Sequence, residues 1–173
     1  MVVLIGGASH TGKTLLAQRM IERYKFPCLS IDLIKMGLIR SRVTSLTPVD
    51  DEALKPYLWN IVKEIVKTAV ENGQNLIVEG AYIPCDWQKY FNRKYRDEIR
   101  AYFIIMSQNY IKRHWAEIVS HACDIEYRRS DDFSAYVALS ENAENLALCK
   151  KYGTNIIFID GKYSVPVPEL RRT

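Results

Sequence analysis

An apolar run near the start of the chain, ending at two glycines, constrains the fold more than any other feature of the sequence. Residues 2–5 read Val-Val-Leu-Ile, without a polar position. A continuous run of this kind is typical of a parallel strand buried on both faces of a sheet. Beyond a short gap, Leu16, Met20 and Tyr24 recur at four-residue spacing, which indicates a helix. The sequence therefore predicts a strand, a glycine-rich loop and a helix in direct succession.

The connecting loop has a spacing that suits phosphate binding. It reads Gly7-Ala8-Ser9-His10-Thr11-Gly12-Lys13-Thr14 and matches the Walker A pattern Gly-x-x-x-x-Gly-Lys-Thr. Glycines let the backbone curl until several N–H groups face phosphate oxygens, and the following helix adds the positive end of its dipole. Lys13 is expected to reach the β- and γ-phosphates of ATP, and the Thr14 hydroxyl to ligate Mg²⁺. We expect His10 to serve through its backbone alone.

The rest of the chain alternates between strand and helix patterns. Further strands are predicted at 28–31, 76–78, 101–106 and 155–159. Strands that alternate with helices predict an α/β fold, here the P-loop NTPase three-layer fold. We expect a five-stranded parallel sheet with helices on both faces.

The helices between these strands are predicted from their caps and apolar periods. Thr47-Pro48 suits a helix start, and Pro56 is expected to break or kink what begins there. Ser107 is predicted to cap a helix that runs to about residue 122, and another helix is predicted at 135–151. Residues 33–46 show no clean period. The charged stretch 123–134 is predicted to be a loop that forms a short lid.

Length and charge favour one domain that binds a small molecule. The 173 residues contain no evident linker or repeat, so a single domain over 1–173 is expected. The 24 basic and 20 acidic residues give a net charge of +4, too mild to predict a nucleic-acid partner. The four cysteines, Cys28, Cys85, Cys123 and Cys149, form no Cys-x-x-Cys pair, and no apolar run suits a membrane span. We expect a reduced, cytoplasmic protein that is a monomer or homodimer and does not act on membranes.

Several segments resemble the nucleoside-monophosphate-kinase-like group of P-loop kinases. Ser30-Ile31-Asp32-Leu33-Ile34-Lys35, followed by Arg40, is similar to the acceptor-side segment of that group. The stretch 76–84, Leu-Ile-Val-Glu-Gly-Ala-Tyr-Ile-Pro, resembles the third-strand segment of 2-phosphoglycerate kinases, chloramphenicol phosphotransferases and zeta-toxin-like kinases. Asp160-Gly161-Lys162 is similar to the adenine-contacting turn of adenylate kinases. The resemblance implies an ATP-dependent small-molecule kinase with Gly161 and Lys162 beside the nucleotide base.

The charged residues suggest a division of roles. Asp32 and Glu79 follow predicted strands, where open α/β sheets bind ligands. Asp32 is a candidate to orient or deprotonate an acceptor hydroxyl; Glu79 is a candidate base or holder of a Mg²⁺-bound water. Arg128 and Arg129 in the predicted lid are candidates to neutralise charge on the transferring phosphoryl group. The remaining candidates are Arg113 for the base and Lys35, Arg40 and Arg42 for an anionic acceptor.

Structural explanations compete at each of these positions. Asp32 could cap a helix, and Arg128 and Arg129 could pair with the neighbouring acids. The basic stretch that contains Lys35, Arg40 and Arg42 could be a solvated face. The functional reading predicts transfer of the ATP γ-phosphoryl group to a small, anionic metabolite. The alternatives are a nucleoside monophosphate kinase and a non-catalytic ATP-binding regulatory module.

Overall fold

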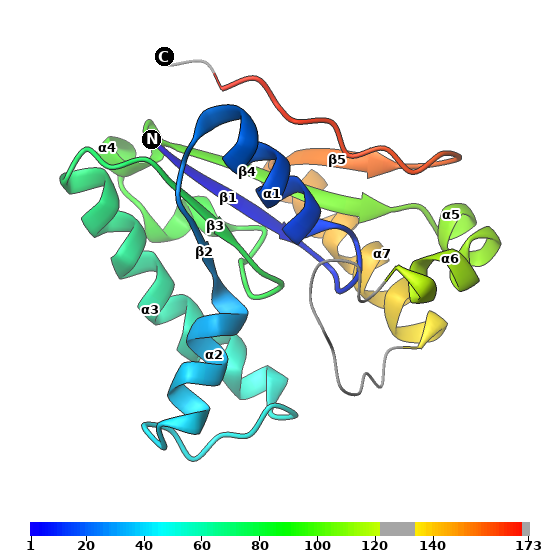
Figure 1. Ribbon diagram of the computed structural model, residues 1–173, viewed down its shortest axis with the longest axis horizontal. Helices are drawn as coiled ribbons and strands as arrows, with labels where there is room; N and C mark the ends of the chain where they lie inside the picture. The colour runs from blue at the N-terminus through cyan, green and yellow to red at the C-terminus, as the bar shows by residue number, and fades with distance from the viewer. Residues whose placement is uncertain (122–133, 171–173) are drawn as a thin grey trace.

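The computed structural model describes residues 1–121 and 134–170. Along the chain the elements are β1 (Val2–Gly7), α1 (Lys13–Tyr24), β2 (Cys28–Ser30), α2 (Ile31–Arg40), α3 (Asp51–Glu71), β3 (Leu76–Glu79), η1 (Trp87–Tyr90), α4 (Arg93–Arg96), β4 (Ile99–Met106), α5 (Gln108–Arg113), α6 (Trp115–Ser120), α7 (Ala135–Tyr152) and β5 (Asn155–Ile159). Strands and helices alternate, as the sequence predicts (Figure 1).

The five strands form one parallel sheet in the order β2-β3-β1-β4-β5. β1 lies in the middle, paired with β3 on one side and β4 on the other. Its pairing brings Ile5 level with Glu79 of β3, and β3 in turn brings Glu79 level with Ser30 of β2. The carboxyl ends of these three strands therefore meet at one edge, where ligands bind in open α/β sheets.

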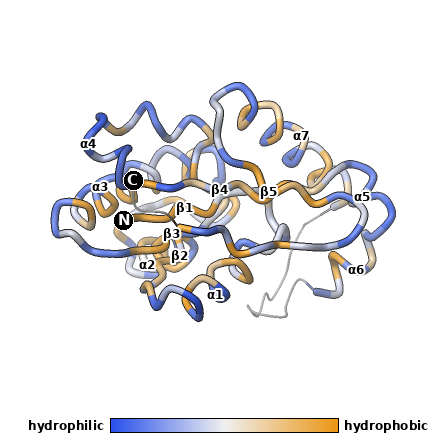
Figure 2. The backbone as a smooth tube through the Cα atoms, turned by 90° about the horizontal axis from the view of Figure 1, so that it is seen from above, coloured by the Kyte–Doolittle hydropathy of each residue, from blue (hydrophilic) through white to orange (hydrophobic). Residues whose placement is uncertain are grey.

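Both faces of the sheet are covered. Alternate residues of β1 point to opposite sides: Val2 and Leu4 pack with α3, while Val3 and Ile5 pack with α1. Cys149 of α7 joins the α3 side. Apolar colour accordingly concentrates in the central strands (Figure 2). This two-sided burial explains why the strands read as continuous apolar runs, and it confirms the predicted three-layer α/β fold.

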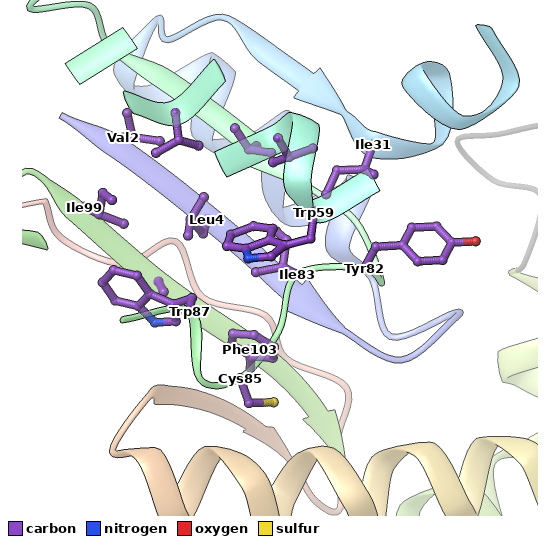
Figure 3. Packing of buried hydrophobic residues seen from close by; sticks show 14 of the residues in the cluster. Val2, Leu4, Ile31, Trp59, Tyr82, Ile83, Cys85, Trp87, Ile99 and Phe103 are labelled. Atoms are coloured by element: carbon purple, nitrogen blue, oxygen red, sulfur yellow. The ribbon is translucent and has the colours of Figure 1, made fainter. Parts of the chain in front are cut away.

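An aromatic cluster fills the α3 side. Trp59 of α3 meets Phe91 edge-on at a centroid distance of 6.2 Å, and Phe91 also contacts Trp87. Figure 3 shows Trp59 and Trp87 in the cluster that contains Leu4 and Phe103. The Tyr82 ring lies at its margin, and the Tyr82 hydroxyl points away from it. Trp59 and Trp87 are thus core residues. In the described part of the chain, no helix is both long and apolar enough to cross a membrane.

Four helix predictions need correction. Residues 33–46 show no clean apolar period in the sequence, but residues 31–40 form the helix α2. Ile31, Ile34 and Leu38 lie on the side of this helix that packs against the core, while Leu33 is exposed. α3 begins at Asp51 rather than at Thr47, since the Asp50 carboxylate accepts bonds from the Thr47 backbone and hydroxyl and closes a turn first.

The other two corrections concern helix continuity. α3 continues through Pro56, which is exposed, so the carbonyl that loses its partner can bond to water. Ser107 does cap a helix, accepting from the Tyr110 N–H, but this helix divides at His114 into α5 and α6. The polar stretch after β3 forms the short helices η1 and α4.

Candidate active site

The glycine-rich loop connects β1 to α1, as predicted. Gly7 and Gly12 have positive φ angles of 136° and 95°, and His10 is also left-handed at 60°. A Cβ at Gly7 would lie 2.5 Å from the Ile104 carbonyl oxygen, so glycine is needed there for both conformation and space. The buried Thr11 hydroxyl donates to the Ala8 carbonyl at 2.9 Å and braces the loop from within.

Lys13 lies over this loop. Its ammonium donates to the Ala8 carbonyl at 2.7 Å, and the residue is only 8% exposed. Lys13 and Thr14 begin α1, whose first turn contains no acidic residue and whose N-cap, Gly12, offers no capping side chain. The positive helix end and the lysine charge therefore act on the same small region, a combination that suits phosphate.

Two candidate carboxylates lie near the carboxyl ends of β3 and β2. Glu79 ends β3 beside β1 and is 3% exposed; the Gly80 N–H that follows it donates to the Ile5 carbonyl at 3.1 Å. Asp32 is not the strand-end residue that was expected. β2 ends at Ser30, and Asp32 lies in the first turn of α2, two residues past the position that pairs with Glu79.

The donor set at this edge fits a nucleotide with Mg²⁺. The buried Ser30 hydroxyl oxygen has no hydrogen-bond partner among the described residues, although Ser30 sits level with the buried Glu79. A hard cation bound by one or two protein oxygens, phosphates and water suits such a place. Thr14 and Glu79 are the residues that would hold it. The residues present are thus compatible with ATP and Mg²⁺.

A polar network that the sequence did not reveal joins α2, α3 and the loop after β3. The Tyr82 hydroxyl donates to the Asp51 carboxylate at 2.7 Å, and the Lys35 ammonium lies 2.5 Å from that hydroxyl and 3.2 Å from Asp51. Burial, followed by the bond to Asp51, raises the pKa of Tyr82. These three side chains come from α2, α3 and the loop after β3, so no local motif could indicate them.

The remaining basic acceptor candidates lie farther away. Arg40 is the last residue of α2, about 13 Å along the helix axis from Ile31 at a rise of 1.5 Å per residue. Arg42 follows in a left-handed conformation, and both arginines are exposed. Lys35 is therefore the only one of the three that the described structure connects to the strand edge.

The candidates for contact with the nucleotide base lie on α5 and in the turn after β5. The Ser107 hydroxyl donates to the Asp160 carboxylate at 2.6 Å, and this bond joins the two segments. Gly161 has a left-handed backbone conformation. The side chains of Lys162 and Arg113 are exposed. Tyr163 follows and points its hydroxyl at the Thr11 carbonyl, 3.4 Å away, and a Cβ on Gly12 would collide with that hydroxyl. Sequence reasoning missed Tyr163, although it directly follows the Asp-Gly-Lys turn.

Tyr163 supports a prediction about nucleotide affinity. Tyr163→Ala is expected to raise the Michaelis constant for ATP about 5-fold, because the loss of one neutral hydrogen bond and its packing loosens the phosphate loop. The acceptor Michaelis constant is expected to stay the same. Steady-state kinetics with each substrate varied in turn checks this, and Tyr152→Ala, which changes another partly exposed tyrosine, is the control. Equal Michaelis constants for ATP in both variants would show that Tyr163 does not contribute to the nucleotide site.

Part of the predicted site lies outside the described residues. Arg128 and Arg129 lie there, as do residues 123–133 of the predicted lid 123–134. Ser134, the last residue of the predicted lid, is described, and its hydroxyl caps α7 by accepting from the Val137 N–H.

Comparison with known proteins shows the fold. No protein-family model matches the sequence, and no curated protein matches it. A deoxyadenosine kinase from M. mycoides, whose structure contains dCMP and dCDP, aligns with a TM-score of 0.57 and 11% identity over 92% of this chain and 90% of its own. A shikimate kinase from Bacteroides thetaiotaomicron aligns with a TM-score of 0.53 and 12% identity over 92% and 85%. The chain therefore shares a three-layer α/β fold with these two kinases.

Proposed function

We propose that this protein is an ATP- and Mg²⁺-dependent phosphotransferase that acts on a small metabolite. One observation carries the proposal: the glycine-rich loop Gly7–Thr14, with Lys13 lying over it, has the buried Glu79 at the end of the neighbouring strand. Phosphoryl transfer depends on positioning and charge neutralisation, and this arrangement supplies both. The kinase fold supports the proposal.

Each side chain has a proposed role. The loop amides and Lys13 bind the β- and γ-phosphates, while Thr14 and Glu79 hold the cation or its water. Bound Mg²⁺ would neutralise phosphate charge. Asp32 orients the acceptor hydroxyl and accepts its proton.

The residues farther from the loop complete the proposed site. Arg113, Gly161 and Lys162 border the nucleotide base. Arg128 and Arg129 neutralise charge during transfer. We also propose that the protein works in the cytoplasm.

The acceptor is proposed to be anionic, such as a phosphorylated or carboxylated metabolite. The stretch from Lys35 to Arg42 has three cations and no acid. Since the Lys35 charge is already paired with Asp51, the two arginines are the cations of this stretch left to recognise an anion.

This proposal predicts a selective effect of the arginines. Arg40→Ala and Arg42→Ala are each expected to weaken acceptor affinity about 10- to 150-fold, the value of one charge-assisted hydrogen bond, with little change for ATP. Arg96→Ala, an exposed arginine of α4 at the opposite end of the sheet, is the control. Unchanged acceptor affinity in both variants would reduce the stretch to a solvated basic face.

The function itself is tested by an acceptor screen. Purified protein with ATP and Mg²⁺ is incubated with phosphorylated, carboxylated and neutral hydroxyl metabolites and with nucleoside monophosphates, and ADP release is read over background hydrolysis. A hit among the anionic metabolites supports the proposal, and a hit confined to nucleoside monophosphates identifies that type of kinase instead. Tight ATP binding without turnover on any acceptor would favour a regulatory module.

A further inference from the structure

Two buried cysteines outside the proposed site lie in direct contact. Cys85 belongs to the loop after β3 and Cys149 to the last turns of α7, and 64 positions of sequence separate them. Their sulfur atoms are 3.2 Å apart, both thiols are free, and the residues are 4% and 0% exposed. Figure 3 shows the Cys85 sulfur on the side of its loop that faces a helix. The spacing along the sequence gave no sign of this pair.

The backbone holds the two cysteines together without help from their sulfurs. Thr154, in the turn between α7 and β5, donates its hydroxyl to the Cys85 carbonyl at 2.8 Å and its N–H to the Cys149 carbonyl at 3.0 Å. One residue therefore fixes both backbones. Because a disulfide needs a sulfur separation of about 2.0 Å, the sulfurs need to approach by only about 1 Å.

A metal site explains this pair less well than redox chemistry does. A structural zinc site needs four ligands, and the described residues contain no cluster of three or more His, Cys, Asp or Glu side chains that could hold a metal. The third described cysteine, Cys28, is on β2, at the far edge of the sheet from β5. Burial, together with the negative charge of Glu79, raises the pKa of Cys28 to about 12, so its thiolate is scarce.

We propose that Cys85 and Cys149 form a peroxide-sensitive dithiol that oxidises to an internal disulfide joining the loop after β3 to α7. The thiolate of Cys85 attacks one peroxide oxygen, the O–O bond breaks, and the departing hydroxide takes a proton to become water. The Cys149 sulfur then attacks the resulting sulfenic acid, the S–O bond breaks, and a second water leaves as the S–S bond forms. The two thiols lose two electrons in total, and the peroxide gains them.

The hydrogen bond between the thiols supports this order of events. Donation from Cys149 lowers the pKa of Cys85, and the same contact, with burial, raises the pKa of Cys149. Cys85 is also the less completely buried of the two residues, so it is the better attacking thiol and Cys149 the resolving one.

The disulfide would restrict the motion of a segment that borders the proposed acceptor side. The loop that contains Cys85 also contains Tyr82, which bonds to Lys35 and Asp51. The bond would close a loop between positions 64 apart, a length at which a cross-link strongly restricts the unfolded chain. The oxidised protein is thus expected to melt about 5–10 °C higher than the reduced protein. This inference does not depend on the proposed function.

The test uses the full chain with Cys28→Ser and Cys123→Ser, which leaves only the pair. After hydrogen peroxide treatment, titration under denaturing conditions is expected to fall from two thiols to none, and the intact mass to fall by two hydrogens. Peptide mapping should find Cys85 linked to Cys149, and dithiothreitol should restore both thiols and the lower melting temperature. The control adds Cys149→Ser and should form no internal disulfide.

Two results would overturn the proposal. One is a folded protein that keeps both thiols after treatment. The other is a product in which Cys85 becomes sulfinic acid without a linked peptide. If the double-serine protein does not fold, the same peptide map of the oxidised wild-type chain decides the matter, since a Cys85–Cys149 peptide supports the pair and its absence rejects it.

Discussion

Lys13→Ala is expected to lower phosphoryl transfer by about 1000-fold or more while leaving the protein folded, because the change removes a charge that acts on the transferring group in a water-poor site. Lys13 donates to the Ala8 carbonyl of its own loop, while the core consists of the apolar clusters on the two faces of the sheet, so the sheet and core should survive its removal. Transfer rates with saturating ATP and circular-dichroism melting measure the two effects. Lys150→Ala, which changes an exposed lysine of α7, is the matched control and should retain normal turnover. A folded Lys13→Ala protein with wild-type turnover would refute the phosphate-loop assignment.

Asp32→Asn and Glu79→Gln are each expected to lower turnover by about 100-fold, the scale of a lost proton acceptor or cation-positioning group. Both changes keep the side-chain shape and remove the negative charge. ATP affinity should change much less, since the loop amides and Lys13 remain.

Single-turnover measurements separate chemistry from binding in these two variants. The controls are Asp97→Asn and Glu22→Gln, which change exposed acids away from the strand edge. Near-normal turnover in both Asp32→Asn and Glu79→Gln would make these acids structural and leave the acceptor side without a catalytic group.

The strands were predictable because their burial is recorded in continuous apolar runs. All five occur where they were expected, with ends that differ by two residues or fewer, and residues 155–159 match at both ends. The glycine-rich loop was equally accessible, because it is one continuous stretch of the sequence. The glycines, the start of the following helix and the lysine all lie within Gly7–Thr14.

The helices were harder because tertiary contacts override local signals. Ile31, Ile34 and Leu38 pack on the core side of α2, but the exposed Leu33 between them hides the period. Likewise, the turn at Thr47 looks like a helix start until the Asp50 side chain is seen to bond back to it. Where a helix begins and ends therefore depends on which groups the fold buries.

The acceptor side and the thiol pair could not be predicted, since their members are distant in sequence. Lys35 and Tyr82 are 47 positions apart, and Cys85 and Cys149 are 64 apart. Only the parallel pairing of the strands and the return of α7 beside the sheet bring them together. The pairing of Lys35 with Asp51 also changes the reading of the basic stretch, which looked unopposed in the sequence.

The most direct test of the phosphate site is an NMR titration of the backbone amides with ADP and Mg²⁺. We expect the Gly7–Thr14 amides to shift strongly and to saturate together, with smaller changes at Glu79 and at the turn containing Gly161. The amides of α4, at the opposite end of the sheet, should stay in place and serve as the internal reference. Unshifted loop amides at saturating nucleotide, or shifts confined to another surface, would contradict the assignment of Gly7–Thr14 as the phosphate-binding loop.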